Sequence, residues 1–241
     1  MLTLAIDTSG TTLSAALLED LTTRAEFFLN TGDNHSQHLL PAIKRIYSLA
    51  GAAIPDTDLF VCTEGPGSFT GLRIGVGTVK GLALATDKPV LGLSTLEVLA
   101  ANMGPDSGRI YPLLDAKRGQ VYAGAYRMKG GIVPEQIAEE LLADVTSWIS
   151  SIKEEGKIVF LGSGALKYAD VIKAARPDSF VAAAHFSYIR ASVAGCLGVT
   201  KFLDGGRTDV LSFAPRYLRL SEAERKLSPG DTPEDKKVDK P

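Results

Sequence analysis

The stretch LTLAIDTSGTTLSAALLED, Leu2–Asp20, reads as two short apolar strands joined by a polar tip. The first strand ends at Asp7, the tip contains Gly10, and the second strand is expected over Leu13–Leu18. Glycine and small polar residues are typical of tight turns between strands. The segment therefore predicts a β-hairpin that carries a carboxylate at its tip.

The same order of features returns about a hundred residues later, in RIYPLLDAKRGQVYAGAYR. An apolar strand ends at Asp115, a tip contains Gly119, and a strand follows over Val121–Tyr126. The sequence therefore predicts a second hairpin of the same kind.

Each hairpin is followed by a strand, a glycine pair and a helix. DLFVCTEGPGSF leads into Gly65 and Gly67, and KIVFLGSGALKY leads into Gly162 and Gly164. Two α/β halves with this shared order predict a duplicated fold of the actin-like ATPase (ribonuclease H-like) class, with a cleft between the halves. Two unrelated α/β lobes are the alternative.

We expect the first subdomain over residues 1–102 and the second over residues 103–220. A capping box at Ser94 and Glu97 opens the last helix of the first half, and a helix near Tyr188–Leu203 closes the second. Residues 221–241 are rich in charge and poor in apolar side chains, which predicts a mobile charged tail.

Composition excludes several classes of protein. The formal net charge is −2, which argues against a protein that binds nucleic acid by itself. The N-terminus has no basic flank and reaches Asp7 after five apolar or neutral residues past Met1, so neither a signal peptide nor a membrane span is expected. We expect a cytoplasmic protein. The two cysteines lie in apolar runs and are expected to pack in the core.

The hairpin tips and glycine turns are candidate contacts for a nucleotide or another anion, because exposed backbone amides and carboxylate-bound magnesium could face phosphates there. The alternative is that Asp and Gly only satisfy the turns. The candidates are Asp7, Thr8, Ser9, Gly65, Gly67, Asp115, Lys117, Gly162 and Gly164. Neither a Walker loop nor a dinucleotide fingerprint fits the glycines after Glu64.

The helix expected after Gly67 has two apolar faces. Leu72, Val76, Val79 and Ala83 would face the sheet, while Ile74, Gly77, Gly81 and Ala85 cluster nearly opposite. Glycine inside a helix costs about 1 kcal/mol relative to alanine, so something should pack closely on the second face. Either another helix of this chain, around Leu39–Ala50, or a helix of a partner protein would satisfy the pattern.

The three histidines do not form a metal motif. His35 and His38 are three residues apart, and no HExxH sequence or further spaced ligand accompanies them. No metal site is expected.

Several segments together resemble one bacterial family, TsaB, formerly called YeaZ. The most distinctive is GPGSFTGLRIGVGTVKGLA, and the others are MLTLAIDTSG, HSQHLLP, LGLSTLEVLA, DAKRGQVYAGAYR and APRYLRLSEAE. The resemblance implies an actin-like fold without catalysis of its own, in a subunit that dimerises with TsaD, the enzyme that transfers threonylcarbamoyl to the tRNA adenosine beside the anticodon. It also implies help in recruiting the ATPase TsaE, and a homodimer when TsaD is absent.

From this resemblance and the helix pattern, two helices are expected to bind the partner. The residues are His35, Ser36, Leu39, Leu40, Ile43, Ile74, Gly77, Thr78, Gly81 and Ala85. Contact with tRNA is expected only through the complex. No cofactor is required by the chain itself, and ATP or ADP is a candidate only at the complex with TsaE. An autonomous small-molecule kinase of the same fold and an M22-type metallopeptidase remain as alternatives.

Overall fold

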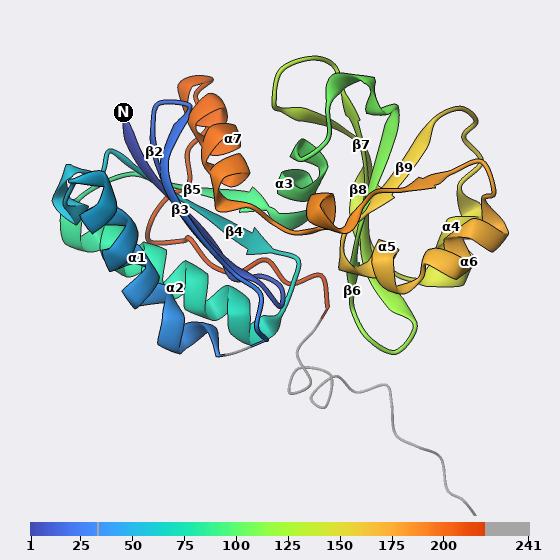
Figure 1. Ribbon diagram of the computed structural model, residues 1–241, viewed down its shortest axis with the longest axis horizontal. Helices are drawn as coiled ribbons and strands as arrows, with labels where there is room; N and C mark the ends of the chain where they lie inside the picture. Colours follow the sequence, from blue (N-terminus) through green and yellow to red (C-terminus); the bar gives the residue numbers. More distant parts are fainter. Residues whose placement is uncertain (33, 220–241) are drawn as a thin grey trace, which may run out of the picture.

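The chain forms two lobes, each built on a five-stranded sheet (Figure 1). The computed structural model describes residues 1–32 and 34–219. Strand order is β3-β2-β1-β4-β5 in the first sheet and β10-β9-β6-β7-β8 in the second. The predicted charged tail over residues 221–241 lies outside the described residues.

The first sheet contains the hairpin expected from Leu2–Asp20. Its strands are β1 (Leu2–Asp7), β2 (Leu13–Glu19), β3 (Thr22–Leu29), β4 (Leu59–Gly65) and β5 (Val90–Ser94). β1 pairs antiparallel with β2 and parallel with β4, and β4 pairs parallel with β5. The hairpin prediction is therefore confirmed, while the third strand β3 was not predicted.

The second sheet repeats this arrangement strand for strand. Its members are β6 (Arg109–Asp115), β7 (Gln120–Met128), β8 (Pro134–Asp144), β9 (Ile158–Leu161) and β10 (Phe180–Val181). β6 pairs antiparallel with β7 and parallel with β9, as β1 does with β2 and β4. The matching order and directions confirm the predicted duplication.

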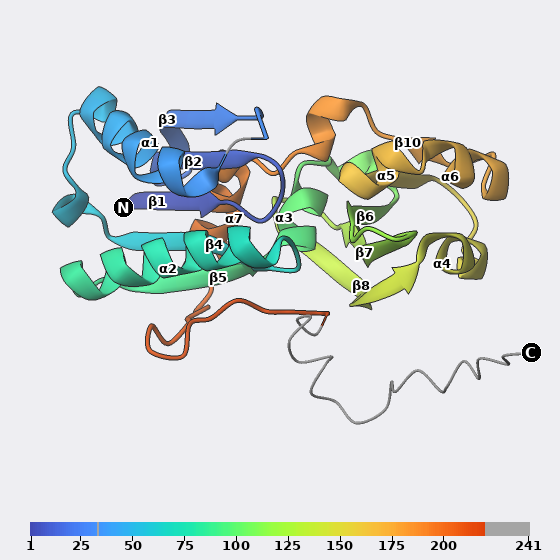
Figure 2. The same cartoon turned by 90° about the horizontal axis from the view of Figure 1, so that it is seen from below.

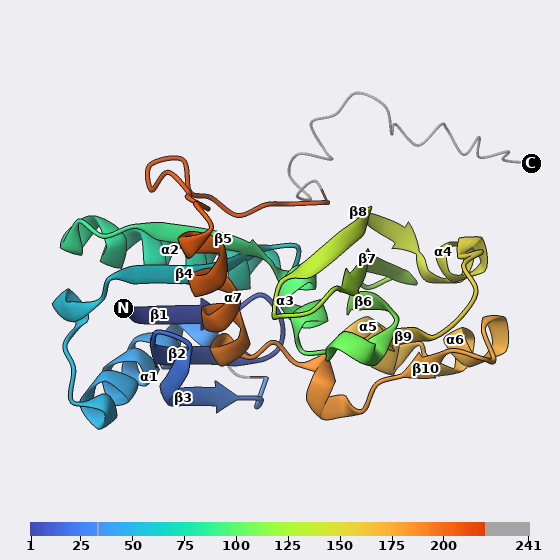
Figure 3. The same ribbon diagram turned by 90° about the horizontal axis from the view of Figure 1, so that it is seen from above.

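Helices cover both sheets. α1 (His35–Ala50) and α2 (Phe69–Thr86) lie side by side on one face of the first sheet (Figures 1 and 2). α7 (Ala191–Leu203) lies across the opposite face (Figure 3). α3 (Thr95–Ala101) lies between the lobes. The second lobe carries α4 (Val145–Ser151), α5 (Ser163–Lys167) and α6 (Ala169–Ala175), and three short 3-10 turns occur at Ile54–Asp56, Pro105–Ser107 and Ala184–Ser187.

The position of α7 corrects the expected second subdomain, 103–220. α7 begins at Ala191 rather than near Tyr188, and it packs on β1 and β2 of the first lobe. Gly195 and Gly198 allow this close approach, because a Cβ on either would overlap the side chain of Leu18 or Val61. Since α1 and α2 both cover one face of the first sheet, α7 buries the other face. The chain thus leaves the first lobe after α3 and returns to it.

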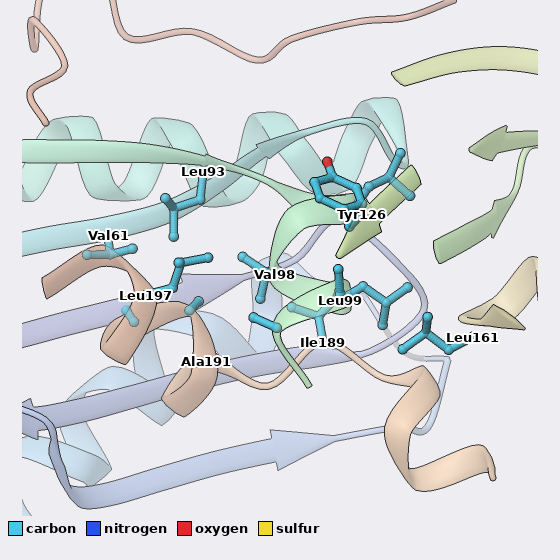
Figure 4. Close-up of a cluster of buried hydrophobic side chains, with 14 of the residues drawn as sticks. Val61, Leu93, Val98, Leu99, Tyr126, Leu161, Ile189, Ala191 and Leu197 are labelled. Carbon is cyan, nitrogen blue, oxygen red and sulfur yellow. The ribbon is translucent and has the colours of Figure 1, made fainter. Parts of the chain in front are cut away.

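One hydrophobic cluster joins the two lobes (Figure 4). Val98 and Leu99 of α3 lie at its centre and are fully buried. Val61 and Leu197 contribute from the first lobe and Leu161 from the second. The lobes therefore share a core rather than meeting at a surface.

Residues 204–219 form a segment that we call the C-terminal strap. The Lys80 ammonium on α2 donates to the carbonyls of Leu211 and Phe213 at 2.6 and 3.1 Å. The backbone N–H of Arg216 donates to the Glu64 carbonyl at 2.7 Å, and its guanidinium pairs with Glu140 on β8. The strap therefore runs along the first lobe and binds the second.

The predicted capping box at the start of α3 is half correct. The Ser94 hydroxyl accepts from the backbone N–H groups of Leu96 and Glu97. The Glu97 carboxylate instead pairs with Lys201 on α7 at 2.7 Å. A charged partner from a distant helix has replaced the local backbone contact.

The glycines of α2 differ in their surroundings, which gives a matched test of the fold. A Cβ at Gly71 would overlap the Thr8 carbonyl oxygen, whereas one at Gly77 would meet nothing within 4 Å. Gly71→Ala should lower the free energy of unfolding by about 1 to 3 kcal/mol, since backbone must move. Gly77→Ala should raise it by up to about 1 kcal/mol through helix propensity. Urea denaturation of both variants measures the difference, and equal effects would contradict the packing of α2 on the β1–β2 hairpin.

Candidate functional site

A pocket of about 900 Å³ lies between the lobes, at the tips of the two hairpins. Ser9 and Thr11 line it from the β1–β2 tip, and Asp115 and Lys117 from the β6–β7 tip. Of the nine predicted nucleotide contacts, four lie in the wall: Ser9, Gly67, Asp115 and Lys117. The structure thus brings the two predicted tips together, as the duplicated fold requires.

Asp7 is not in the pocket wall but is fully buried beneath the hairpin tip. One of its oxygens accepts from the backbone N–H and hydroxyl of Ser9 and from the Thr63 hydroxyl, at 3.2, 2.6 and 2.5 Å. The other oxygen is buried with no partner among the described residues. Burial raises the pKa of Asp7, although the hydrogen bonds from Ser9 and Thr63 oppose the rise. The side chain braces the hairpin.

Asp115 lies in the pocket wall, but its charge is already balanced. Lys117 and Lys167 place their ammonium groups 3.1 and 3.0 Å from one of its oxygens. Partial burial would raise the pKa of Asp115, but these lysines outweigh it and hold the pKa below its usual value. The Asp115 carboxylate is therefore ionised and forms ion pairs with Lys117 of its own hairpin tip and with Lys167 of α5.

The remaining predicted contacts hold the chain together. The Thr8 hydroxyl is buried and donates to the Gly71 carbonyl at 2.7 Å. Gly65 has a φ of 133°, and a Cβ there would overlap the Arg216 carbonyl. A Cβ would likewise collide with the backbone of a neighbouring segment at Gly67 and Gly162, and one at Gly164 would lie in tight contact with Leu113. Thr8, Gly65, Gly162 and Gly164 do not line the pocket, so their prediction as ligand contacts is not supported by the geometry.

Aromatic and cationic side chains supply much of the rest of the wall. Phe69 at the start of α2 stacks on Tyr217 of the strap with ring centroids 4.6 Å apart. The Arg73 guanidinium lies 4.0 Å from the Phe69 ring centroid, and its Nε donates to the Tyr217 hydroxyl. Arg219 donates to Gln120 at 2.5 Å. Sequence reasoning missed these residues, because only the strap brings Tyr217 and Arg219 to the cleft.

The three histidines are not part of a cluster of metal-ligating side chains in the part of the chain that the structure describes. No set of three His, Cys, Asp or Glu side chains is arranged to hold a metal ion within residues 1–32 and 34–219. His35 Nε2 lies 2.9 Å from the Gly10 carbonyl, which ties the start of α1 to the hairpin tip.

A second candidate site is the outer face of α1 and α2, which we call the outer helix face. Gly77 and Gly81 are exposed, and a Cβ on either would meet nothing within 4 Å. Leu40, Leu49 and Leu84 are exposed by 52%, 64% and 51%. Neither α1 nor any other described element covers these glycines. The alternative prediction, that another helix of this chain packs on them, is therefore wrong.

The predicted partner-binding residues divide into two groups. Leu39 and Ile43 are each only 1% exposed and pack toward the first sheet, so their assignment to a partner surface is corrected. Their positions on α1 lie on its inner side. Ser36, Leu40, Gly77, Gly81 and Ala85 are exposed, and His35, Ile74 and Thr78 are half-buried.

The duplicated sheets and the pocket between them define a protein of the actin-like ATPase fold class, and the described helices include none long and apolar enough to cross a membrane. Residues 29–227 match the family described as TsaD, tRNA N6-adenosine threonylcarbamoyltransferase. The tRNA threonylcarbamoyladenosine biosynthesis protein TsaB of Bacillus subtilis is 38% identical, over 94% of this chain and 97% of that protein. The chain belongs to the TsaB (YeaZ) family.

Two further relatives agree with this membership. TsaB of Escherichia coli is 32% identical, over 93% of this chain and 97% of that protein. The solved structure of YeaZ from Pseudomonas aeruginosa superposes with a TM-score of 0.79 at 26% identity, over 90% of this chain and 99% of that one. Both cover nearly the whole chain, so the resemblance extends to both lobes.

The buried carboxyl of Asp7 predicts a pH dependence. Because its folded pKa is raised above the ordinary value of about 4, the unfolded chain ionises first, and wild-type stability falls as the pH rises from about 4 to the folded pKa. Asp7→Asn removes this loss, so its melting temperature relative to wild type should be higher at pH 8 than at pH 3. Thermal melts at both values measure the trend. The opposite trend would indicate that a cation compensates the Asp7 charge.

Proposed function

We propose that this protein acts in tRNA threonylcarbamoyladenosine biosynthesis as the non-catalytic partner of a TsaD-type transferase. The outer helix face carries the proposal: Gly77, Gly81 and Leu84 are exposed on α2, and Leu40 and Leu49 are exposed on α1. Small residues let another backbone approach closely, and exposed aliphatic groups beside them gain from burial. The names of the relatives, and the match to the TsaD family, support a TsaD-type protein as the occupant.

The state of the pocket supports a role without catalysis. A kinase of this fold would need a carboxylate able to hold magnesium. Asp7 is buried under its own hairpin, and Asp115 is paired with Lys117 and Lys167. No observation favours the alternatives of an autonomous kinase or a metallopeptidase.

In this proposal the chain stabilises and activates TsaD by forming a heterodimer through α1 and α2. A second copy of the chain occupies the same face when TsaD is absent. The complex recruits TsaE, and tRNA is contacted through the complex. The chain itself requires no cofactor, and any ATP or ADP is bound where TsaE joins.

Replacing Gly77 or Gly81 by Leu tests the proposal. Each position is open in the free chain, so the variants should fold, and leucine is the better helix former. Against a partner helix the added side chain overpacks the interface. This should cost about 1 to 3 kcal/mol of binding free energy, which is a loss of about 5- to 150-fold in affinity. Binding to purified TsaD by calorimetry, and tRNA modification in a reconstituted mixture, measure the effect.

Ala174→Leu is the matched control, since Ala174 is an exposed small residue on α6, in the other lobe. It should leave TsaD affinity within about twofold of wild type. A folded Gly81→Leu chain with unchanged TsaD affinity and unchanged modification would refute the outer helix face as the binding surface.

A further inference from the structure

A second, strongly basic pocket lies at the end of the second sheet that points away from the cleft. Its volume is about 440 Å³, and Arg109, Arg127 and Lys157 line it together with the backbone of Gly108 and Gly156. Arg109 begins β6, and Asp115 at the other end of that strand lines the cleft. The two residues are six positions apart along an extended strand, which separates them by roughly 20 Å. The pocket is therefore distinct from the cleft.

The two arginines face each other directly. Arg109 and Arg127 are register partners across the antiparallel β6–β7 pair, so their side chains leave the same face of the sheet. Like charges in directly opposite positions destabilise a strand pair. The β-sheet alone gives no reason for this pairing, whereas an anion between the guanidinium groups would turn the repulsion into attraction.

Two of the three cations are held in place without being neutralised. Arg109 donates to the backbone carbonyl of Glu155 at 2.9 Å, and Lys157 donates to that of Asp106 at 2.7 Å. The loop that carries Lys157 is itself fixed, because Arg176 donates to the carbonyls of Ile152 and Glu154. These acceptors are uncharged, so they order the side chains and leave their positive charge available.

No carboxylate among the described residues compensates the three charges through an ion pair. Glu135 stands opposite Arg127 on β8, but it pairs with Lys129 at 2.6 Å. Glu155 also lines the pocket and forms no such pair. The Arg127 side chain makes no hydrogen bond or ion pair with another described residue. Three convergent cations around a hollow are thus left with a surplus of positive charge.

We propose that this pocket binds a phosphate group. The planar guanidinium fork matches the oxygens of phosphate and can bind them bidentately, and a lysine adds a point charge. A phosphate ester of a small molecule and the phosphodiester backbone of an RNA present the same chemistry. The proposal does not depend on the proposed function, because it needs neither TsaD nor the outer helix face.

Titration of the full chain with inorganic phosphate, at constant ionic strength held by chloride, tests the site. Saturable binding is expected, with Arg127→Gln weakening the affinity by about tenfold through loss of a charge-assisted contact. Arg127→Lys should restore part of the loss. Arg45→Gln removes an arginine from α1, far from the pocket, and should leave the affinity within about twofold.

An unmodified tRNA transcript as competitor identifies the source of the phosphate. If the RNA backbone supplies it, the transcript should displace inorganic phosphate, and Arg127→Gln should lower the slope of log affinity against log salt by about one. If a small phosphate compound supplies it, inorganic phosphate should bind with the same dependence on Arg127 and the transcript should not compete. Either result supports a phosphate site.

Three results would overturn the proposal. One is the absence of saturable binding of either probe to the unchanged chain. Another is an affinity for phosphate that Arg127→Gln leaves within about twofold of wild type. The third is an equal loss in Arg45→Gln, which would show a general effect of net charge rather than a site.

Discussion

The burial of α3 between the two sheets is the constraint on which the rest of the structure depends. Val98 and Leu99 are fully buried among residues of both lobes, and α7 packs against the same helix. Burying a large aliphatic side chain contributes about 1.5 to 3 kcal/mol. The relative position of the hairpin tips, and therefore the shape of the cleft, follows from this shared core together with the Glu97–Lys201 ion pair that ties α3 to α7.

The cleft contains a pocket large enough for a ligand, but the two aspartates at its hairpin tips are bonded to other residues of the same chain. Asp7 accepts three hydrogen bonds from its own hairpin and β4, and Asp115 is paired with two lysines. The stacked pair Phe69–Tyr217 lies at the wall where the strap passes. Such internal commitments stabilise the two tips as structural elements.

Local pattern was sufficient to predict the duplicated core. Strand, acidic tip, strand and glycine turn occur twice in contiguous sequence, and the two sheets match strand for strand. The return of α7 to the first lobe could not be read from chain order, since it depends on Leu18 and Val61 meeting Gly195 and Gly198. The order of the elements along the chain also could not predict that Tyr217 stacks on Phe69. Those contacts are long-range and leave no local signal.

Helical periodicity placed the glycines of α2 on an outward face, and the spacing of Leu39, Ile43 and Ile46 likewise marks the buried side of α1, but the family resemblance assigned residues of both sides to the partner. Leu39 and Leu40 are neighbours in sequence, yet one is 1% exposed and the other 52%. The family segment HSQHLLP indicated the helix and not its rotation about its own axis. Contact with the sheet sets that rotation.

The C-terminal strap has a mechanical consequence for the two-lobed molecule. It is attached to α2 through Lys80 and to β8 through the Arg216–Glu140 pair, in which the carboxylate is only 3% exposed. The strap thus adds a second connection between the lobes to the one made by the shared core around α3. A change in the spacing of the lobes would have to break both connections, so the two lobes are held as one mechanical unit.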